Sequence, residues 1–346
     1  MGLETLYQQV KEAISRLDFH KIWPGFAPLR FALYDQESCY FDGGYIQKTD
    51  DFCANTSICF QGEQIAIWMV TEELDISVLT SKLVHEMFHG YQTIRGWDCW
   101  PDEMEALYNY RYDAGNLSLR LHENELLLEL LDRYDRTSCR ELLASRKYRC
   151  EKYPYEFSYE SRVEEIEGTA NYVEWQVLKQ LDPGKASALT DHMRAVMTKP
   201  EYLFPIRISS YYTGALMINA LLHAGMYTFE PSARPAGLAA LKDIDPSENL
   251  LSGSEACLPA VTDAIRAFRQ KTGEIIRAAL DRNDVVLHGP LELAGLNIYN
   301  ARSLNGYLTS TYFLMYRDGE ENKVIRGNFV IRMKDEKTID TVYRLE

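Results

Sequence analysis

The chain has 346 residues, of which 46% are hydrophobic and 25% are charged, a composition that is typical of a folded globular protein and excludes wholesale disorder. A formal net charge of −14 argues against nucleic acid and against an anionic membrane as the main partner, because both attract positive protein surfaces. The seven cysteines form no CxxC pair and the first ten residues lack a signal-peptide pattern, so we expect reduced thiols and a cytoplasmic location.

The N-terminal part of the chain is predicted to be a β-rich lobe. Residues 3–18 have the apolar spacing of an amphipathic helix, and runs that favour strands follow at 30–34, 39–46, 57–60 and 64–70. Turn residues such as glycine and aspartate separate these runs, as expected for short neighbouring strands.

Helical apolar spacing begins after residue 70 and continues for about two hundred residues. The predicted helices lie near 76–95, 103–133, 137–149, 158–181, 184–198, 208–227 and 255–281, with breaks at 182–184 and 231–235. The segment 209–229 lacks Asp, Glu, Lys and Arg, but it contains Asn219 and His223, so we interpret it as a buried core helix and not as a membrane span.

The final part of the chain returns to alternating patterns from about residue 284. Strands are predicted at 291–299, 307–316, 323–333 and 338–345, joined by turns in an antiparallel meander. The predicted fold is therefore α+β and mainly helical. Its expected division is a domain at 1–283, with a β-rich lobe at 25–70 and a helical body at 71–283, followed by a C-terminal antiparallel β-domain at 284–346.

The sequence His85-Glu86-Met87-Phe88-His89 is an HExxH motif inside one of the predicted helices. Histidines four residues apart share one face of a helix, so both imidazoles can reach one metal ion. Glu86 lies beside them, where a carboxylate can accept a proton from a metal-bound water. The motif thus predicts a metal site with His85 and His89 as ligands and Glu86 as general base.

A third ligand is expected from a later helix, because no further histidine follows His89 at a metal-ligand spacing. On a regular helix, a single stripe contains Glu160, Glu164, Glu167, Asn171 and Glu174. Apolar neighbours such as Ile166 and Val173 indicate that this helix is largely buried, and buried carboxylates need a cation or hydrogen-bond donors.

The HExxH motif followed by the sequence EGxAxYxE, which begins at Glu167, resembles the gluzincin zinc metallopeptidases. The resemblance implies a thermolysin-like catalytic domain and a Zn²⁺ ion held by His85, His89 and Glu167, with Glu164 as the alternative third ligand. It also implies that Asn171 orients a ligand imidazole, and Glu174 is a further candidate for that role. The interval of 78 positions from His89 to Glu167 exceeds the family's short spacer, which we attribute to inserted helices at 103–149.

The sequence Tyr211-Tyr212-Thr213-Gly214-Ala215-Leu216 is similar to the start of a helix in aminopeptidase-N-like gluzincins. That similarity implies that Tyr211, or its neighbour Tyr212, stabilises the oxyanion. His223 is the thermolysin-like alternative, although a core histidine is the favoured interpretation. The fold class that the resemblance implies also makes the strand at 64–70 an edge strand that pairs with an extended substrate.

The resulting hypothesis is a zinc-dependent metallopeptidase that hydrolyses peptide bonds of a peptide or protein substrate by means of a metal-activated water. The alternative is a non-catalytic, metal-binding pseudo-peptidase scaffold that binds a peptide or protein partner. A di-iron carboxylate protein is disfavoured because no second ExxH exists. The segment 121–125 is interpreted as a polar helix face or as part of a cleft wall.

Overall fold

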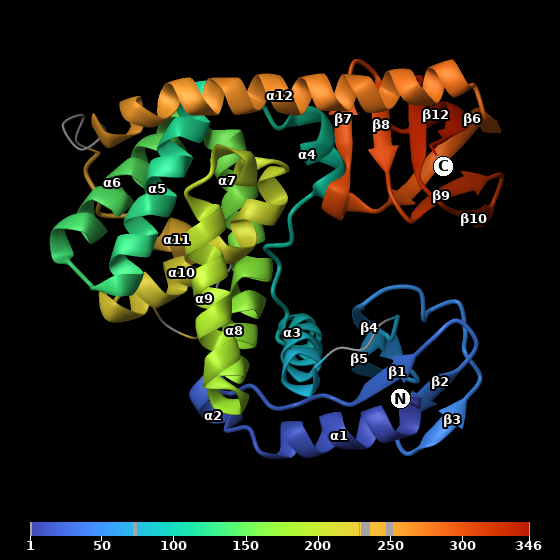
Figure 1. Ribbon diagram of the computed structural model, residues 1–346, viewed down its shortest axis with the longest axis horizontal. Helices are drawn as coiled ribbons and strands as arrows, with labels where there is room; N and C mark the ends of the chain where they lie inside the picture. The colour runs from blue at the N-terminus through green and yellow to red at the C-terminus, as the bar shows by residue number, and fades with distance from the viewer. Residues whose placement is uncertain (1, 72–74, 228, 230–235, 247–251, 346) are drawn as a thin grey trace.

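Two β-sheets lie on the same side of a helical body (Figure 1), and residues of all three parts line a cleft that opens between the sheets. This computed structural model describes residues 2–71, 75–227, 229, 236–246 and 252–345. The predicted break at 231–235 lies outside the described residues. The expected α+β class, with a large helical part, is confirmed by two sheets of five and seven strands and the long helical region between them.

The N-terminal sheet has the strand order β3-β2-β1-β5-β4, in which β1 and β5 are parallel and the other neighbours are antiparallel. Its strands are β1 (Phe31–Tyr34), β2 (Cys39–Phe41), β3 (Gly44–Ile46), β4 (Thr56–Phe60) and β5 (Glu63–Met69). The predicted strand at 39–46 is a hairpin, because Asp42 and Gly43 take positive φ values in a tight turn.

The prediction that residues 64–70 form the edge strand is wrong. β5 lies between β1 and β4, and its central residues 65–67 are fully buried, as expected for an interior strand. The edge is instead β4, whose second side has no strand partner among the described residues. A helix, α1 (Leu3–Ser15), packs on β1 and β2 through an apolar face, which confirms the predicted amphipathic helix with an earlier end.

The helical body follows the predicted order. Its elements are α2 (Phe19–Ile22), α3 (Ile76–Ile94), α4 (Glu103–Asn109), α5 (Ala114–Asp132), α6 (Arg136–Lys152), α7 (Pro154–Val163), η1 (Glu164–Gly168), α8 (Thr169–Leu181), α9 (Pro183–Met197), η2 (Pro200–Leu203), α10 (Ile206–His223), α11 (Ala236–Ala239) and α12 (Ser252–Arg282). None of the described helices is both long and apolar enough to cross a membrane.

Two predicted helices differ from the structure. The helix predicted at 103–133 is broken into α4 and α5, because Asp113 is extended and its carboxylate caps α5 by accepting from the Asn116 N–H at 2.9 Å. The helix predicted at 158–181 begins earlier, at Pro154, which suits the first turn of a helix. It contains a π-helical turn, η1, between α7 and α8.

The C-terminal sheet has the strand order β10-β9-β6-β12-β11-β8-β7, and all its neighbours are antiparallel. Its elements are β6 (Val285–Leu296), η4 (Ile298–Asn300), β7 (Arg302–Leu304), β8 (Tyr307–Ser310), β9 (Phe313–Asp318), β10 (Glu321–Arg326), β11 (Phe329–Met333) and β12 (Thr338–Arg344). The expected simple meander is wrong, because β6 is central and β9 and β11 pair on opposite sides of the β6–β12 pair.

The C-terminal sheet packs on the helical body through two helices. Ile276 and Ala279 of α12 contact Val330 and Tyr343 of the sheet, and apolar residues of α4 cover its other core. Figure 1 shows α12 as one long helix that runs from the helical body to this sheet. The domain boundary at 283/284 stays a prediction.

Candidate metal centre

Helix α3 carries the HExxH motif at the base of the opening between the sheets. Asp75 starts the helix by accepting hydrogen bonds from the Ser77 and Val78 N–H groups. The apolar residues Val84, Met87 and Phe88 are fully buried, which anchors one side of the helix in the core. The opposite side presents His85, Glu86 and His89 to a cleft.

His85, His89 and Glu167 form a compact group, called the ligand group below, whose donor atoms all lie within 4.8 Å of one another. The two Nε2 atoms are 3.1 Å apart, and the Glu167 Oε2 atom lies 3.3 Å from His89 Nε2 and 3.7 Å from His85 Nε2. Two imidazoles and a carboxylate that converge in this way could hold a metal ion. No fourth histidine, cysteine or carboxylate joins the group within the described ranges.

Glu167 reaches the histidines from the π-helical turn η1. A π turn holds more residues than an α turn, so it divides the single acidic stripe that a regular helix would have. Glu160 lies before the turn and Glu164 begins it, and both pair with arginines of α5 and α6, whereas Glu167 and Glu174 contact α3. The two pairs of carboxylates therefore have different partners: Glu160 and Glu164 bind arginines, and Glu167 and Glu174 lie beside the histidines of α3.

The π turn packs directly against α10 at two glycines. A Cβ atom on Gly168 would lie 2.5 Å from the Gly214 Cα, and a Cβ on Gly214 would lie 2.7 Å from the Glu164 backbone oxygen. Such distances are too short for any side chain, so only glycine fits at this helix crossing. The two glycines therefore allow the π turn and α10 to approach closely.

Gln92 fixes the tautomer of His89. The Gln92 Nε2 donates to the Ile166 backbone oxygen and to the Thr169 hydroxyl, each at 2.9 Å, so its amide oxygen must face the other way. That oxygen lies 2.8 Å from His89 Nδ1, which therefore carries the proton and donates. The lone pair of His89 is consequently on Nε2, which points at the ligand group.

Glu174 lies beside the Nδ1 atom of His85, at a longer distance and without the geometry of a hydrogen bond. Its Oε2 lies 3.4 Å from His85 Nδ1, which favours the proton on Nδ1 and leaves the Nε2 lone pair toward His89 and Glu167. Burial alone would lower the pKa of His85, but Glu167 and Glu174 raise it to about 10. The two carboxylates thus favour a positive charge at this ring, which a second proton or a metal ion on Nε2 supplies.

The second oxygen of Glu167 is held by Arg207, which lies near the start of α10. The guanidinium donates to Glu167 Oε1 at 2.7 Å and also pairs with Glu103, and the Tyr159 hydroxyl donates to Glu103 at 2.7 Å. Burial raises the pKa of Glu167, but His89, His85 and Arg207 lower it well below its usual range. The carboxylate is therefore held in its charged form.

Glu86 and Tyr211 both line the cleft beside the ligand group. Burial raises the pKa of Glu86, while the two histidines oppose that effect. Burial and the adjacent Glu167 carboxylate raise the pKa of Tyr211. Tyr212 also lines the cleft, but it lies near Glu174 and stacks on Tyr202, with ring centres 6.0 Å apart.

Other predicted roles differ from the structure. Asn171 donates to the Glu167 backbone oxygen at 3.2 Å and has no contact with a ligand imidazole, so Gln92 and Glu174 hold the rings instead. His223 is exposed near the end of α10 and does not line the cleft, so neither the oxyanion role nor the core position applies.

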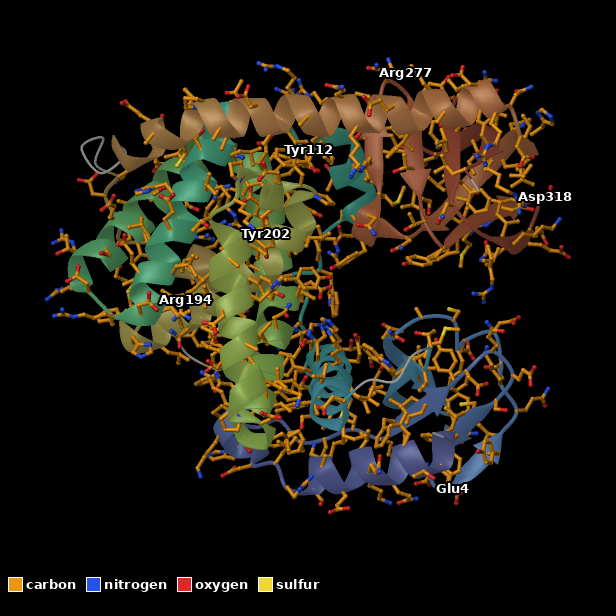
Figure 2. All side chains as sticks on the ribbon, in the orientation of Figure 1. Glu4, Tyr112, Arg194, Tyr202, Arg277 and Asp318 are labelled. Carbon is orange, nitrogen blue, oxygen red and sulfur yellow. The ribbon has the colours of Figure 1, made fainter. Side chains whose placement is uncertain are left out.

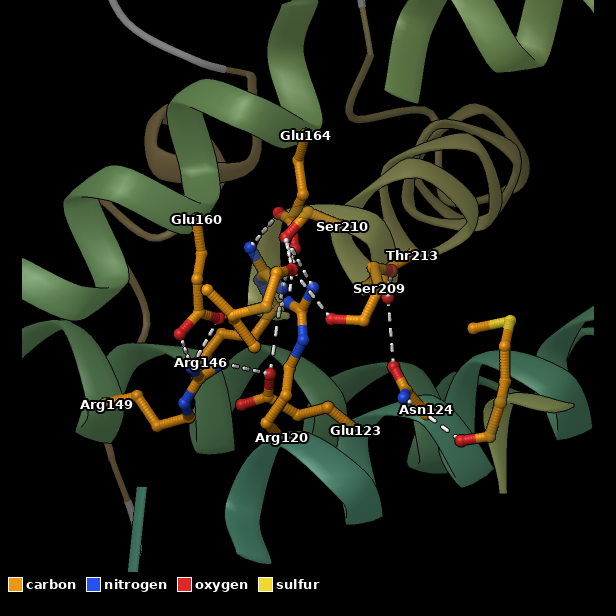
Figure 3. Close-up of polar contacts among 12 residues, drawn as sticks. Arg120, Glu123, Asn124, Arg146, Arg149, Glu160, Glu164, Ser209, Ser210 and Thr213 are labelled. Carbon is orange, nitrogen blue, oxygen red and sulfur yellow. Dashed lines mark hydrogen bonds and ion pairs between the residues drawn. The ribbon is translucent and has the colours of Figure 1, made fainter. Parts of the chain in front are cut away.

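Glu164 is not a ligand, because it belongs to a buried ionic network below the π turn (Figure 3). Arg146 binds its Oε2 at 2.5 Å and Arg120 binds its Oε1. Burial raises the pKa of Glu164, but the two arginines lower it to about 2. Glu123, from the segment 121–125, belongs to the same network, because it is fully buried and accepts a hydrogen bond from Arg149 at 2.7 Å. For Glu123, the interpretation of this segment as a polar face or a cleft wall is therefore wrong.

The cleft around the ligand group has a volume of about 1230 Å³ and draws on all three parts of the fold. Residues 53–57 and Trp68 line it from the N-terminal lobe, and Tyr299 and Tyr312 line it from the C-terminal sheet. Side chains leave the space between the two sheets open toward solvent (Figure 2). An extended molecule therefore has access to the ligand group.

Sequence reasoning missed three residues of the site, and two of them had no recognisable sequence signal. Arg207 and Glu103 lie far from the HExxH motif and from each other, and only folding joins them. Gln92 lies one turn after His89 on the same helix, so its position was a signal that could have been used. No known protein family model matches the chain, and no curated protein or solved structure gives a match.

Proposed function

We propose that the protein is a zinc-dependent metallopeptidase of the gluzincin type, with a thermolysin-like catalytic domain. The observation that carries this proposal is the convergence of His85 Nε2, His89 Nε2 and a Glu167 oxygen, with the Glu86 carboxylate beside them in a large cleft. Structural zinc sites have four protein ligands, whereas catalytic sites have three and keep one position open. The three ligands found here fit the catalytic type.

The spacing of the three donor atoms supports zinc. Bonds of about 2.0–2.1 Å at tetrahedral angles place ligand atoms about 3.3 Å apart. The observed separations of 3.1, 3.3 and 3.7 Å lie around that value. Two nitrogens and one oxygen are also a donor set that suits zinc better than magnesium or calcium, which prefer oxygen.

In this mechanism zinc supplies Lewis-acid activation of a water and of the substrate carbonyl. The Glu86 carboxylate accepts the proton of the attacking water and then delivers it to the leaving amine nitrogen. The Tyr211 hydroxyl donates a hydrogen bond to the carbonyl oxygen as negative charge develops there. Gln92 and Glu174 keep both imidazoles oriented, and Arg207 keeps the Glu167 carboxylate charged.

A peptide is the substrate that the cleft fits best. Asn55, Thr56 and Ser57 line it at and just before the edge strand β4, which can pair with the backbone of an extended chain. Aromatic side chains such as Trp100, Tyr299 and Tyr312 surround the opening and offer contact area for apolar substrate side chains.

Metal analysis combined with a peptide-library cleavage assay tests the proposal. We expect one zinc ion per chain and cleavage by the wild-type protein, whereas Glu86→Gln should keep zinc and lose activity by about 10²–10⁴-fold. His85→Ala should lose zinc as well. Equal cleavage by Glu86→Gln would refute the catalytic assignment. Zinc and peptide binding without any cleavage would instead support the non-catalytic pseudo-peptidase scaffold.

A further inference from the structure

A second cavity of about 740 Å³ lies between the helical body and the C-terminal sheet. It is bounded by α4, residues 110–113, the start of α10, the middle of α12, and β7. Tyr112, which is labelled in Figure 2 below α12, is part of its wall. The volume falls within the range of small-molecule sites, about 300–1,000 Å³.

The cavity wall has an excess of positive charge that the protein does not neutralise. Glu103 and Arg207 pair with each other, and Asp113 caps α5. The remaining charged residues of the wall are the arginines Arg111, Arg269 and Arg302. None of the three has an ion pair with a carboxylate in the part of the chain that the structure describes.

Arg302 is the central residue of this wall. It is half-buried, its guanidinium carbon lies 4.6 Å from the centre of the Phe268 ring, and it donates to the Thr272 hydroxyl at 3.2 Å. Burial without a carboxylate partner lowers the pKa of Arg302. A guanidinium has five N–H donors, so one hydroxyl contact leaves most of them available to a ligand.

The rest of the wall is apolar and aromatic. The rings of Tyr112 and Phe268 have centres 5.3 Å apart, and Leu107 and Ile298 contribute aliphatic surface. Tyr108 also lines the cavity, and its buried hydroxyl has no hydrogen-bond partner among the described residues. A ligand with an anionic group and a flat apolar group would match both parts.

We propose that this cavity is a binding site for a small anionic molecule, in which Arg302 binds a carboxylate or phosphate group and the Phe268 and Tyr112 rings contact an apolar or aromatic group. Arg269 and Arg111 stand at the exposed side of the cavity and add attraction for the anion. The cavity shares Arg207 with the cleft around His85, His89 and Glu167, but the anion contacts proposed here involve none of those three residues and do not depend on the proposed peptidase activity.

Calorimetric titration of the full chain with three probes tests the site. The probes are benzoate, phenyl phosphate and benzyl alcohol, and the protein is first stripped of metal and dialysed so that anions cannot bind a metal ion. We expect at least one of the two anions to bind at least about tenfold more tightly than benzyl alcohol, because only the anions can form charge-assisted hydrogen bonds with Arg302. The tighter of the two anions shows whether the site prefers a carboxylate or a phosphate.

Matched arginine variants identify the site. Arg302→Gln should weaken anion binding at least about tenfold, whereas Arg277→Gln, an exposed position on α12 outside the cavity, should leave it unchanged. If circular dichroism shows that Arg302→Gln is unfolded, the exposed Arg269→Gln replaces it and should weaken binding by a smaller factor. Absence of anion binding to the wild-type protein, or equal binding by the cavity variant and the Arg277 variant, would overturn the proposal.

Discussion

The contact between the π turn and α10 gives the sharpest test of how the fold positions the ligand group. In Gly214→Ala, the new Cβ would lie 2.7 Å from both the Glu164 backbone oxygen and the Gly168 Cα. Carbon atoms normally rest about 3.5–4.0 Å from their neighbours, so the helices must separate by roughly 0.8 Å. Because both obstacles are backbone atoms, no side-chain rotation can relieve the contact.

The expected cost is measured against a control glycine in another helix. Gly273 in α12 also has helical backbone, but a Cβ there would meet only Leu304 at 3.8 Å, an ordinary contact. Both substitutions gain about 1 kcal/mol of helix propensity, so their difference isolates the overpacking, which is about 1–3 kcal/mol. Gly273→Ala should therefore raise the free energy of unfolding in urea, and Gly214→Ala should lie below it by that difference.

The same displacement should weaken metal binding. Glu167 belongs to the π turn, and metal–ligand distances tolerate only about 0.2 Å of change. A zinc competition titration should show lower affinity for Gly214→Ala and unchanged affinity for Gly273→Ala, and Gly168→Ala should behave like Gly214→Ala. If the Gly214 and Gly273 variants are equally stable and bind zinc equally well, the close helix crossing does not position Glu167.

Three further outcomes are expected. Tyr211→Phe should keep zinc and lose about 10²–10³-fold in turnover, measured on a cleaved peptide, while Tyr212→Phe should be milder. Glu174→Gln should lower zinc affinity by about 10–100-fold in competition titration, because it removes the carboxylate that orients His85. The pKa of Glu164 is lowered to about 2 in the folded protein. Its stabilising charge is therefore complete above the unfolded pKa and is lost as pH falls through the folded value, so the stability difference between wild type and Glu164→Gln should shrink from about pH 4.5 to about pH 2 in urea titrations.

The sequence predicted the parts of the site that depend on local spacing. His85 and His89 share a helix face whatever the rest of the fold does, and the EGxAxYxE pattern indicated Glu167 before the structure placed it near them. The choice between Glu164 and Glu167 remained open, because a regular helix presents both on one stripe. The π turn directs Glu164 and Glu167 to different sides of the helix, and no local sequence pattern predicts that turn.

Long-range pairing explains most of the remaining differences. β4 is an edge strand because β5 pairs with β1 on one side and with β4 on the other. An alternating sequence pattern predicts a strand but does not specify its neighbours. The C-terminal sheet shows the same difference. Turn residues correctly indicated hairpins, but the sheet has seven strands where four were predicted, and their order is not that of a meander. Arg207 and Glu103 are 104 residues apart in the chain, so only folding shows that they meet beside Glu167.

The long interval between His89 and Glu167 has a structural reason in the buried ionic network of Figure 3. The interval contains α5 and α6, and these helices supply the three fully buried arginines of the network, which are Arg120, Arg146 and Arg149. Three buried glutamates balance them: Glu123 on α5, Glu160 on α7, and Glu164 on the π turn.

Glu164 and Glu160 lie about one and two helical turns before Glu167 in the chain, so α5 and α6 neutralise the acids that lead to Glu167. Removing one partner of such a buried pair leaves an uncompensated charge and costs about 3–5 kcal/mol. Helices α5 and α6 are therefore coupled by charge to the helix that carries Glu167. The acidic stripe and the long interval are separate features in the sequence. In the structure they are joined, because arginines from the interval pair with Glu160 and Glu164 of the stripe.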